Sequence, residues 1–83
     1  MKPELYFFEA CPYCKKITDF IDQHSIHQRV ILKEIRKNHT YYNELLSLTQ
    51  DDQVPCLVYR GEPLLNSEKI LQWMNQHLVN RER

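Results

Sequence analysis

Two cysteines separated by two residues are the part of this sequence best suited to chemistry. Cys11 and Cys14 enclose Pro12 and Tyr13, and the segment comes just after the apolar residues 5–8. Two thiols at this spacing at the start of a helix can close a short redox-active disulfide, Cys11–Cys14, and the N–H groups of a helix N-terminus favour a thiolate. We therefore expect Cys11 to be the nucleophile and Cys14, one turn into the helix, to be the resolving thiol.

The charged residues after this pair bear on the same chemistry. Lys15 and Lys16 follow Cys14 directly and add positive charge that favours the thiolate of Cys11, provided that their side chains turn back toward its sulfur. A zinc site is an alternative use of paired cysteines, but it needs two more ligands, and the only other candidates are Cys56 and four scattered histidines. A structural disulfide is another, but a four-residue loop removes little chain entropy. The redox interpretation is the stronger one, and we expect no metal.

Size and charge limit the other possible functions. The 83 residues predict one domain spanning residues 1–83, and 42% hydrophobic residues suffice for a core without metal or multiple bridges. Eleven basic and eleven acidic residues give a formal net charge of zero, so nothing indicates binding to nucleic acid or to a membrane surface. Glu4 and Glu9 interrupt what would be the apolar part of a signal peptide. We expect a soluble, cytoplasmic monomer whose three cysteines rest as thiols.

The third cysteine, Cys56, has two interpretations. Free cysteines are commonly buried and behave as small hydrophobic residues. Because Cys56 follows Pro55, the alternative is that it lies within reach of the dithiol and modulates it.

Hydrophobic periodicity predicts four strands and three helices. Residues 2–8, 29–35, 56–59 and 62–65 read as strands, with a tight turn at Arg60–Gly61 between the last two. Helices are expected over residues 12–24 and from an N-cap near Asn38 to Thr49. A last helix is expected after a cap at Asn66–Ser67, with Ile70, Leu71, Met74 and Leu78 toward the core. The order strand, helix, strand, helix, strand, strand, helix predicts an α/β fold with a four-stranded mixed sheet and helices on its faces.

This arrangement resembles the dithiol glutaredoxins of the thioredoxin-like superfamily. The resemblance covers nearly the whole chain and depends on Cys11-Pro12-Tyr13-Cys14 after the first strand and on Val54-Pro55 before the third. The second half is also similar to the N-terminal domain of glutathione transferases. The resemblance implies a thioredoxin-like fold, glutathione as reductant with no permanently bound cofactor, and a role in electron transport and cell redox homeostasis.

The same resemblance implies a glutathione site. It implies a cis peptide bond at Pro55, with the backbone of Val54 free to pair with glutathione as a short strand addition. Asn66 and Ser67, at the start of the last helix, would receive the γ-glutamyl carboxylate, although either residue can serve as a helix cap alone. Tyr13 would line the cleft, and Gln53 is a further candidate contact.

The sequence also departs from the family pattern. Many glutaredoxins carry a lysine three residues before the first cysteine, and this chain has Phe8 there, followed by Glu9. The glycine pair often found before the last helix is replaced by Leu64-Leu65-Asn66. Lys15, Lys16 or Arg36 could supply the missing charge.

These observations predict a glutathione-dependent thiol–disulfide oxidoreductase. Its partners would be glutathione and proteins that carry disulfides or glutathione mixed disulfides. One alternative is a glutaredoxin-like electron donor reduced by a thioredoxin reductase. Another is a non-catalytic thioredoxin-like binding module with an idle dithiol, or one that shares an iron–sulfur cluster between subunits through Cys11 and glutathione. A glutathione transferase would need a further helical domain.

Overall fold

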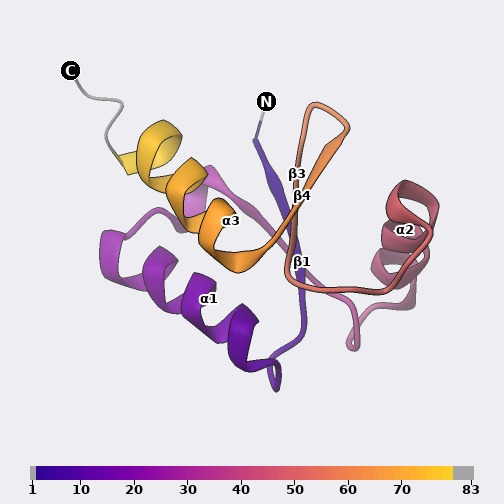
Figure 1. Ribbon diagram of the computed structural model, residues 1–83. Coiled ribbons are helices and arrows are strands. Elements are labelled where there is room, and N and C mark those ends of the chain that lie inside the picture. The colour runs from indigo at the N-terminus through magenta and orange to yellow at the C-terminus, as the bar shows by residue number, and fades with distance from the viewer. Residues whose placement is uncertain (1, 80–83) are drawn as a thin grey trace.

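The computed structural model describes residues 2–79, so Met1 and residues 80–83 of the expected domain lie outside the described residues. The predicted order of elements is confirmed, and Figure 1 shows their arrangement. The strands are β1 (Glu4–Phe7), β2 (Ile31–Glu34), β3 (Cys56–Tyr59) and β4 (Glu62–Leu65); the helices are α1 (Pro12–His24), α2 (His39–Thr49) and α3 (Ser67–Met74).

The four strands form one mixed sheet in the order β2-β1-β3-β4. β1 runs parallel to β2 and antiparallel to β3, which continues into the antiparallel hairpin with β4. The turn of the hairpin has positive φ angles at both Arg60 (55°) and Gly61 (82°). Two central residues with φ above zero give the turn whose twist suits a two-residue hairpin, which explains the use of the chain's only glycine here.

The helices cover the two faces of the sheet unequally: α1 and α3 lie on one face and α2 on the other (Figure 1). Successive side chains of a strand point to opposite faces, so β1 contributes Leu5 to the α1/α3 side and Tyr6 to the α2 side. On the first side Leu5 packs among buried residues of α1, β3 and α3, such as Ile17, Leu57 and Ile70. Full burial of each such aliphatic side chain stabilises the fold by about 1.5–3 kcal/mol.

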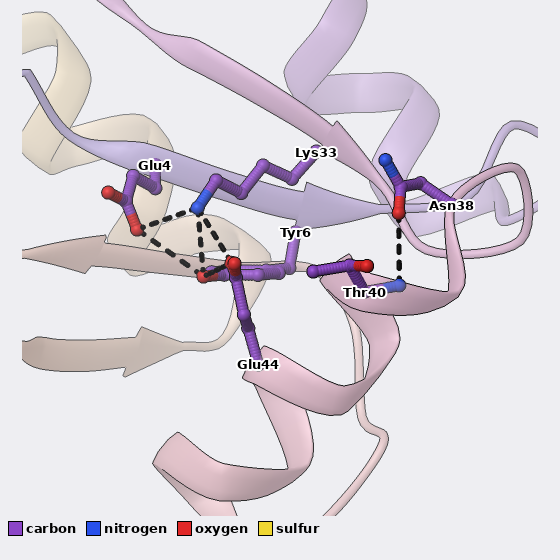
Figure 2. A network of polar contacts seen from close by, with 6 residues as sticks. All are labelled: Glu4, Tyr6, Lys33, Asn38, Thr40 and Glu44. Carbon is purple, nitrogen blue, oxygen red and sulfur yellow. Dashed lines mark hydrogen bonds and ion pairs between the residues drawn. The ribbon is translucent and has the colours of Figure 1, made fainter.

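A polar network holds α2 against the sheet, as Figure 2 shows. The Tyr6 hydroxyl donates to Oε1 of Glu44 at 2.9 Å, and Nζ of Lys33 lies 2.7 Å from the same oxygen and 3.3 Å from Oε1 of Glu4. Burial, reinforced by the Glu44 hydrogen bond, raises the pKa of Tyr6 to about 12, so its hydroxyl stays protonated and can donate. The N-cap predicted at Asn38 is confirmed, because its Oδ1 accepts the Thr40 N–H at 2.9 Å.

The boundaries of three elements differ from the sequence predictions. β1 is shorter than residues 2–8, and β2 begins at Ile31 instead of residue 29. Arg29 belongs to a 3₁₀ turn (His27–Arg29), and its Nη1 donates to the Leu78 carbonyl at 3.0 Å. After α3 the chain continues as a π-helical turn (Asn75–Val79), in which Leu78 is buried as expected. Leu71, predicted to face the core, is half-buried and packs against the core on the α1/α3 side.

Candidate redox-active site

The dithiol lies where β1 passes into α1, as the sequence predicted. Cys11 is the N-cap residue, with extended backbone angles, and Pro12 is the first helical residue, where its missing N–H costs nothing. The Cys14 N–H donates to Sγ of Cys11 at 3.3 Å, and the Lys15 N–H donates to the Cys11 carbonyl at 3.0 Å. The sulfur of Cys11 therefore takes the place that a side-chain oxygen has in an ordinary cap. This contact and the positive end of the helix dipole both favour negative charge on that sulfur.

The two thiols of the dithiol differ in environment. Both are free thiols; Cys11 is 7% exposed and Cys14 is 1% exposed. Burial raises the pKa of Cys14 from its ordinary value of 9.0 to about 12, and its hydrogen bond with the Cys11 side chain adds to the rise. Cys14 is thus a neutral thiol at physiological pH, which leaves Cys11 as the better nucleophile of the pair.

Glu34 holds the loop that carries Cys11. Its Oε2 accepts the Glu9 N–H at 3.0 Å, and its Oε1 accepts the N–H groups of Arg36 and Lys37 at 2.6 and 3.1 Å. Burial alone would raise the pKa of Glu34, but these three donors lower it. Because Glu34 ends β2, it ties the loop after β1 to the loop after β2, next to the dithiol.

A groove beside the dithiol brings together all six residues predicted to contact glutathione. It has a volume of about 340 Å³ and is lined by Tyr13, Gln53, Val54, Pro55, Asn66 and Ser67. The Val54–Pro55 peptide bond is cis, as the resemblance implied. The same groove includes Lys16 and Glu68, neither of which the sequence analysis singled out as lining it.

The start of α3 supplies both a cap and unused polar groups. Oδ1 of Asn66 accepts the N–H groups of Glu68 and Lys69 at 2.9 and 3.2 Å, so the Asn66 side chain is a helix cap. The backbone of Asn66 has a φ of 87°, a conformation that asparagine tolerates better than most residues. The hydroxyl and N–H of Ser67 make no hydrogen bond within the described part of the chain, and Ser67 lines the groove. Of the two predicted residues, Ser67 is the one whose donors remain for a ligand.

The lysines after the dithiol form ion pairs elsewhere. Nζ of Lys15 lies 3.3 Å from Oδ1 of Asp19, one turn further along α1. Nζ of Lys16 lies 3.9 Å from Oε2 of Glu68 and 5.9 Å from the centre of the Tyr13 ring. Lys16 therefore joins α1 to the start of α3 across the groove, a long-range pairing that sequence spacing does not predict.

Phe8 occupies the position, three residues before Cys11, at which many glutaredoxins carry a lysine, and its ring contacts a cation. The Arg36 guanidinium lies 3.8 Å from the centre of the Phe8 ring, close enough for a stacked cation–π contact. Arg36 takes part in no ion pair of the described residues. The Phe8 carbonyl also accepts the Cys11 N–H at 3.2 Å. The Arg36 guanidinium is therefore held on a residue that contacts the dithiol loop.

Cys56 is separated from the dithiol by the sheet. It is 0% exposed and packs with Tyr6, Ile35, Leu45 and Val58 on the α2 side, whereas Cys11 and Cys14 belong to the core on the α1/α3 side. Burial raises the pKa of Cys56 to about 11. The expectation of a buried, small hydrophobic residue is confirmed, and the alternative of a modulating thiol beside the dithiol is wrong.

A comparison with protein-family models matches residues 4–64 of this chain to the family described as Glutaredoxin. The chain belongs to the glutaredoxin family. Membership of this family indicates glutathione-linked thiol redox function, and the match includes the dithiol, Gln53, Val54 and Pro55. None of the curated proteins compared with the chain matches it significantly in sequence.

Solved structures share this glutaredoxin's thioredoxin-like fold. A glutaredoxin from Archaeoglobus fulgidus is 20% identical, with a TM-score of 0.66 over 86% of this chain and 83% of that one. A buckwheat glutaredoxin, solved in complex with glutathione, is 17% identical, with a TM-score of 0.63 over 89% of this chain and 68% of that one. A glutathione S-transferase from Drosophila melanogaster is 20% identical, with a TM-score of 0.72 over 95% of this chain but only 36% of its own length. The predicted likeness to both families is confirmed at the level of the fold.

Two further findings concern metals and membranes. Within residues 2–79, no three His, Cys, Asp or Glu side chains gather where they could hold a metal ion. No helix in that range is both long and apolar enough to span a membrane.

Proposed function

We propose that this glutaredoxin is a glutathione-dependent thiol–disulfide oxidoreductase that acts through Cys11 and Cys14. The observation that carries the proposal is the asymmetry of the dithiol: the Cys11 sulfur accepts an N–H at the start of α1, whereas the Cys14 thiol is buried with a pKa raised to about 12. The groove of Tyr13, Gln53, Val54, Pro55, Asn66 and Ser67 beside it supports glutathione as the reductant. Its volume is at the lower end of the range of small-molecule sites, about 300–1,000 Å³.

In the proposed reaction, the Cys11 thiolate attacks one sulfur of a substrate disulfide. A new disulfide forms between Cys11 and that sulfur, and the other sulfur leaves as a thiolate that takes up a proton. When the substrate is a glutathione mixed disulfide, Cys11 becomes glutathionylated, and the thiolate of a second glutathione releases glutathione disulfide and restores Cys11. One free glutathione thiol is consumed for each substrate thiol released, and the other half of the glutathione disulfide comes from the mixed disulfide itself.

For a protein disulfide, Cys14 acts as the second thiol. Cys14 loses its proton and attacks the Cys11 sulfur, the substrate leaves as a dithiol, and the Cys11–Cys14 disulfide forms. Two glutathione molecules then reduce this disulfide and are themselves oxidised to glutathione disulfide. We propose that the chain performs this reaction as a single-domain, cytoplasmic monomer with no permanently bound cofactor.

Glutathione-coupled assays of three variants test this assignment. Cys11→Ser should lose at least 99% of the activity on both substrate classes. Cys14→Ser should still cleave a small glutathione mixed disulfide but lose reduction of a protein disulfide, because only the latter requires a second thiol in the protein. Cys56→Ala is the matched control, since Cys56 lies on the other side of the sheet, and should behave as wild type. Activity retained by Cys11→Ser would refute the proposal.

One observation favours a second candidate, an electron donor reduced by a thioredoxin reductase. Phe8 stands where many glutaredoxins carry a lysine, which removes one contact for glutathione. Turnover supported by reductase and NADPH, with no glutathione-dependent turnover above background, would select this candidate. If neither reductant supported turnover, the chain would be the binding module considered above.

A further inference from the structure

A hollow of about 440 Å³ lies at the end of the molecule away from the dithiol. The hollow is lined by residues just before β1, in the His27–Arg29 turn, at the end of β3, in α3 and in the π-helical turn after it. β1 runs from this end of the molecule toward α1, and α3 runs toward it (Figure 1). It shares no lining residue with the groove beside the dithiol. Its volume is within the range of small-molecule sites.

Three aromatic rings form one wall of this distal hollow. The rings of Tyr59 and Trp73 are 5.1 Å apart at an angle of 53°, and those of Trp73 and His77 are 4.5 Å apart at 28°. Trp73 is only partly buried, so the protein leaves part of its largest aromatic ring open to the hollow. A ring fixed between two neighbours is a preorganised surface for stacking.

The same hollow is also lined by basic and polar side chains. Lys2 and Arg29 both line the hollow, together with the amides of Gln28 and Gln76, and no carboxylate among the described residues does. The bond from Nη1 of Arg29 to the Leu78 carbonyl, at 3.0 Å, fixes its guanidinium at the edge of the hollow. The remaining N–H groups of a guanidinium suit the two oxygens of a carboxylate or phosphate.

We propose that the distal hollow binds a planar aromatic anion, with its ring against Trp73 and His77 and its negative group at Arg29 and Lys2. Neither the aromatic residues nor the basic residues alone identify the ligand. Aromatic rings accept any flat apolar molecule, and two cations accept any anion. Because both sets of residues line one hollow, a single molecule that carries a flat ring and a negative group can contact both. The proposal does not depend on the redox function, because none of these residues belongs to the dithiol or its groove.

Trp73 is the only tryptophan of the chain, so its indole N–H gives a single NMR signal that reports on the hollow. We would titrate the full chain with AMP and with 2-naphthoate, which present a phosphate and a carboxylate, respectively. A saturable shift of the Trp73 signal with either anion supports the proposal, and the tighter of the two identifies the anionic group. Adenosine and inorganic phosphate are the matched probes that lack the charge or the ring. The proposal is overturned if neither anion gives a saturable shift, if adenosine binds as tightly as AMP, or if phosphate alone reproduces the shift.

Variants separate the hollow from the redox site. Arg29→Gln and Lys2→Gln should each weaken binding about tenfold. Lys2→Gln makes the test independent of folding effects, because Lys2 is exposed and does not share the Arg29 bond to Leu78. Arg36→Gln, which removes the same charge near the dithiol, and Cys11→Ser should both bind as wild type. Unchanged binding in Arg29→Gln and Lys2→Gln would refute the proposed contact of the negative group with these two side chains, whatever the result of the redox assays.

Discussion

At the scale of single residues, the three thiols of this chain have three different environments. Cys11 caps a helix with its sulfur and is 7% exposed, Cys14 is buried one turn inside the helix, and Cys56 is buried on the α2 side of the sheet. We propose that the same functional group serves as a nucleophile at Cys11 and a resolving thiol at Cys14, whereas at Cys56 it is a packing residue.

Replacing Cys56 should change how stability depends on pH. Its pKa is raised from 9.0 to about 11 by burial, so folded and unfolded chains both hold the proton below pH 9, and only the unfolded chain releases it between pH 9 and 11. The stability from this thiol is fully present below pH 9 and is lost as the pH rises. Urea unfolding at pH 8 and pH 11 should show wild type losing about 2 kcal/mol more than Cys56→Ala. Equal losses would show that Cys56 ionises freely in the fold.

Arg36 should contribute to glutathione binding. If its guanidinium, stacked on Phe8, supplies the charge of the missing lysine, Arg36→Gln should raise KM for glutathione roughly fivefold, or about 1 kcal/mol, with kcat unchanged. Arg60→Gln is the matched control, because Arg60 also lies over an aromatic ring, that of Tyr59, but at the opposite end of β3. Equal effects of the two substitutions, or an effect on kcat alone, would contradict this role.

At the scale of elements, two helices begin at asparagine caps with different surroundings. Asn66 accepts two N–H groups at the start of α3 and lines the groove, whereas Asn38 accepts one at the start of α2 and does not. The two caps allow the contribution to the groove to be separated from the contribution to stability.

Alanine at either cap should lower the free energy of unfolding, but only one of the two substitutions should change KM for glutathione. Asn38→Ala should cost about 1 kcal/mol. Asn66→Ala should cost about 2 kcal/mol, because alanine also disfavours the positive φ of this position. Urea unfolding measures both. In steady-state assays KM for glutathione should rise in Asn66→Ala alone, since it loosens the groove wall; a rise in both would show that the effect comes from lost stability.

The elements were largely predictable from the sequence, because their signals are local. The cap at Asn38, the start of α1 at Pro12 and the turn at Arg60–Gly61 each depend on a few neighbouring residues. The contacts that complete the site are not local. The pairing of Lys16 with Glu68 and the stacking of Arg36 on Phe8 join segments that are far apart in the sequence, and no spacing rule places the ends of long side chains. The start of β2 was misplaced at Arg29 for the same reason, since this residue bonds to Leu78 across the fold.

At the scale of the whole molecule, two hydrophobic cores share the central strands. β1 contributes Leu5 to one core and Tyr6 to the other, and β3 contributes Leu57 to one and Cys56 to the other. Because both cores pack on the same two strands, we expect one cooperative unfolding transition.

Two probes can test this cooperativity, one for each core. Trp73 packs against the α1/α3 core, and its fluorescence reports on that side. In a Cys11→Ser/Cys14→Ser protein the only thiol is Cys56, and its reactivity toward a thiol reagent reports on the α2 side. The two urea transitions should share one midpoint. Reaction of Cys56 at distinctly lower urea than the loss of Trp73 fluorescence would show that α2 detaches first.

The limited exposure of Cys11 has a consequence for the choice of partner. With 7% of the residue accessible, Cys11 offers little surface to another protein. In the reaction proposed above, a partner must therefore present its disulfide on its own surface. A glutathione mixed disulfide on a flexible loop does this, whereas a disulfide buried inside a rigid domain does not. The selection of substrates by this glutaredoxin would then depend on how far their disulfides protrude more than on the sequence around them.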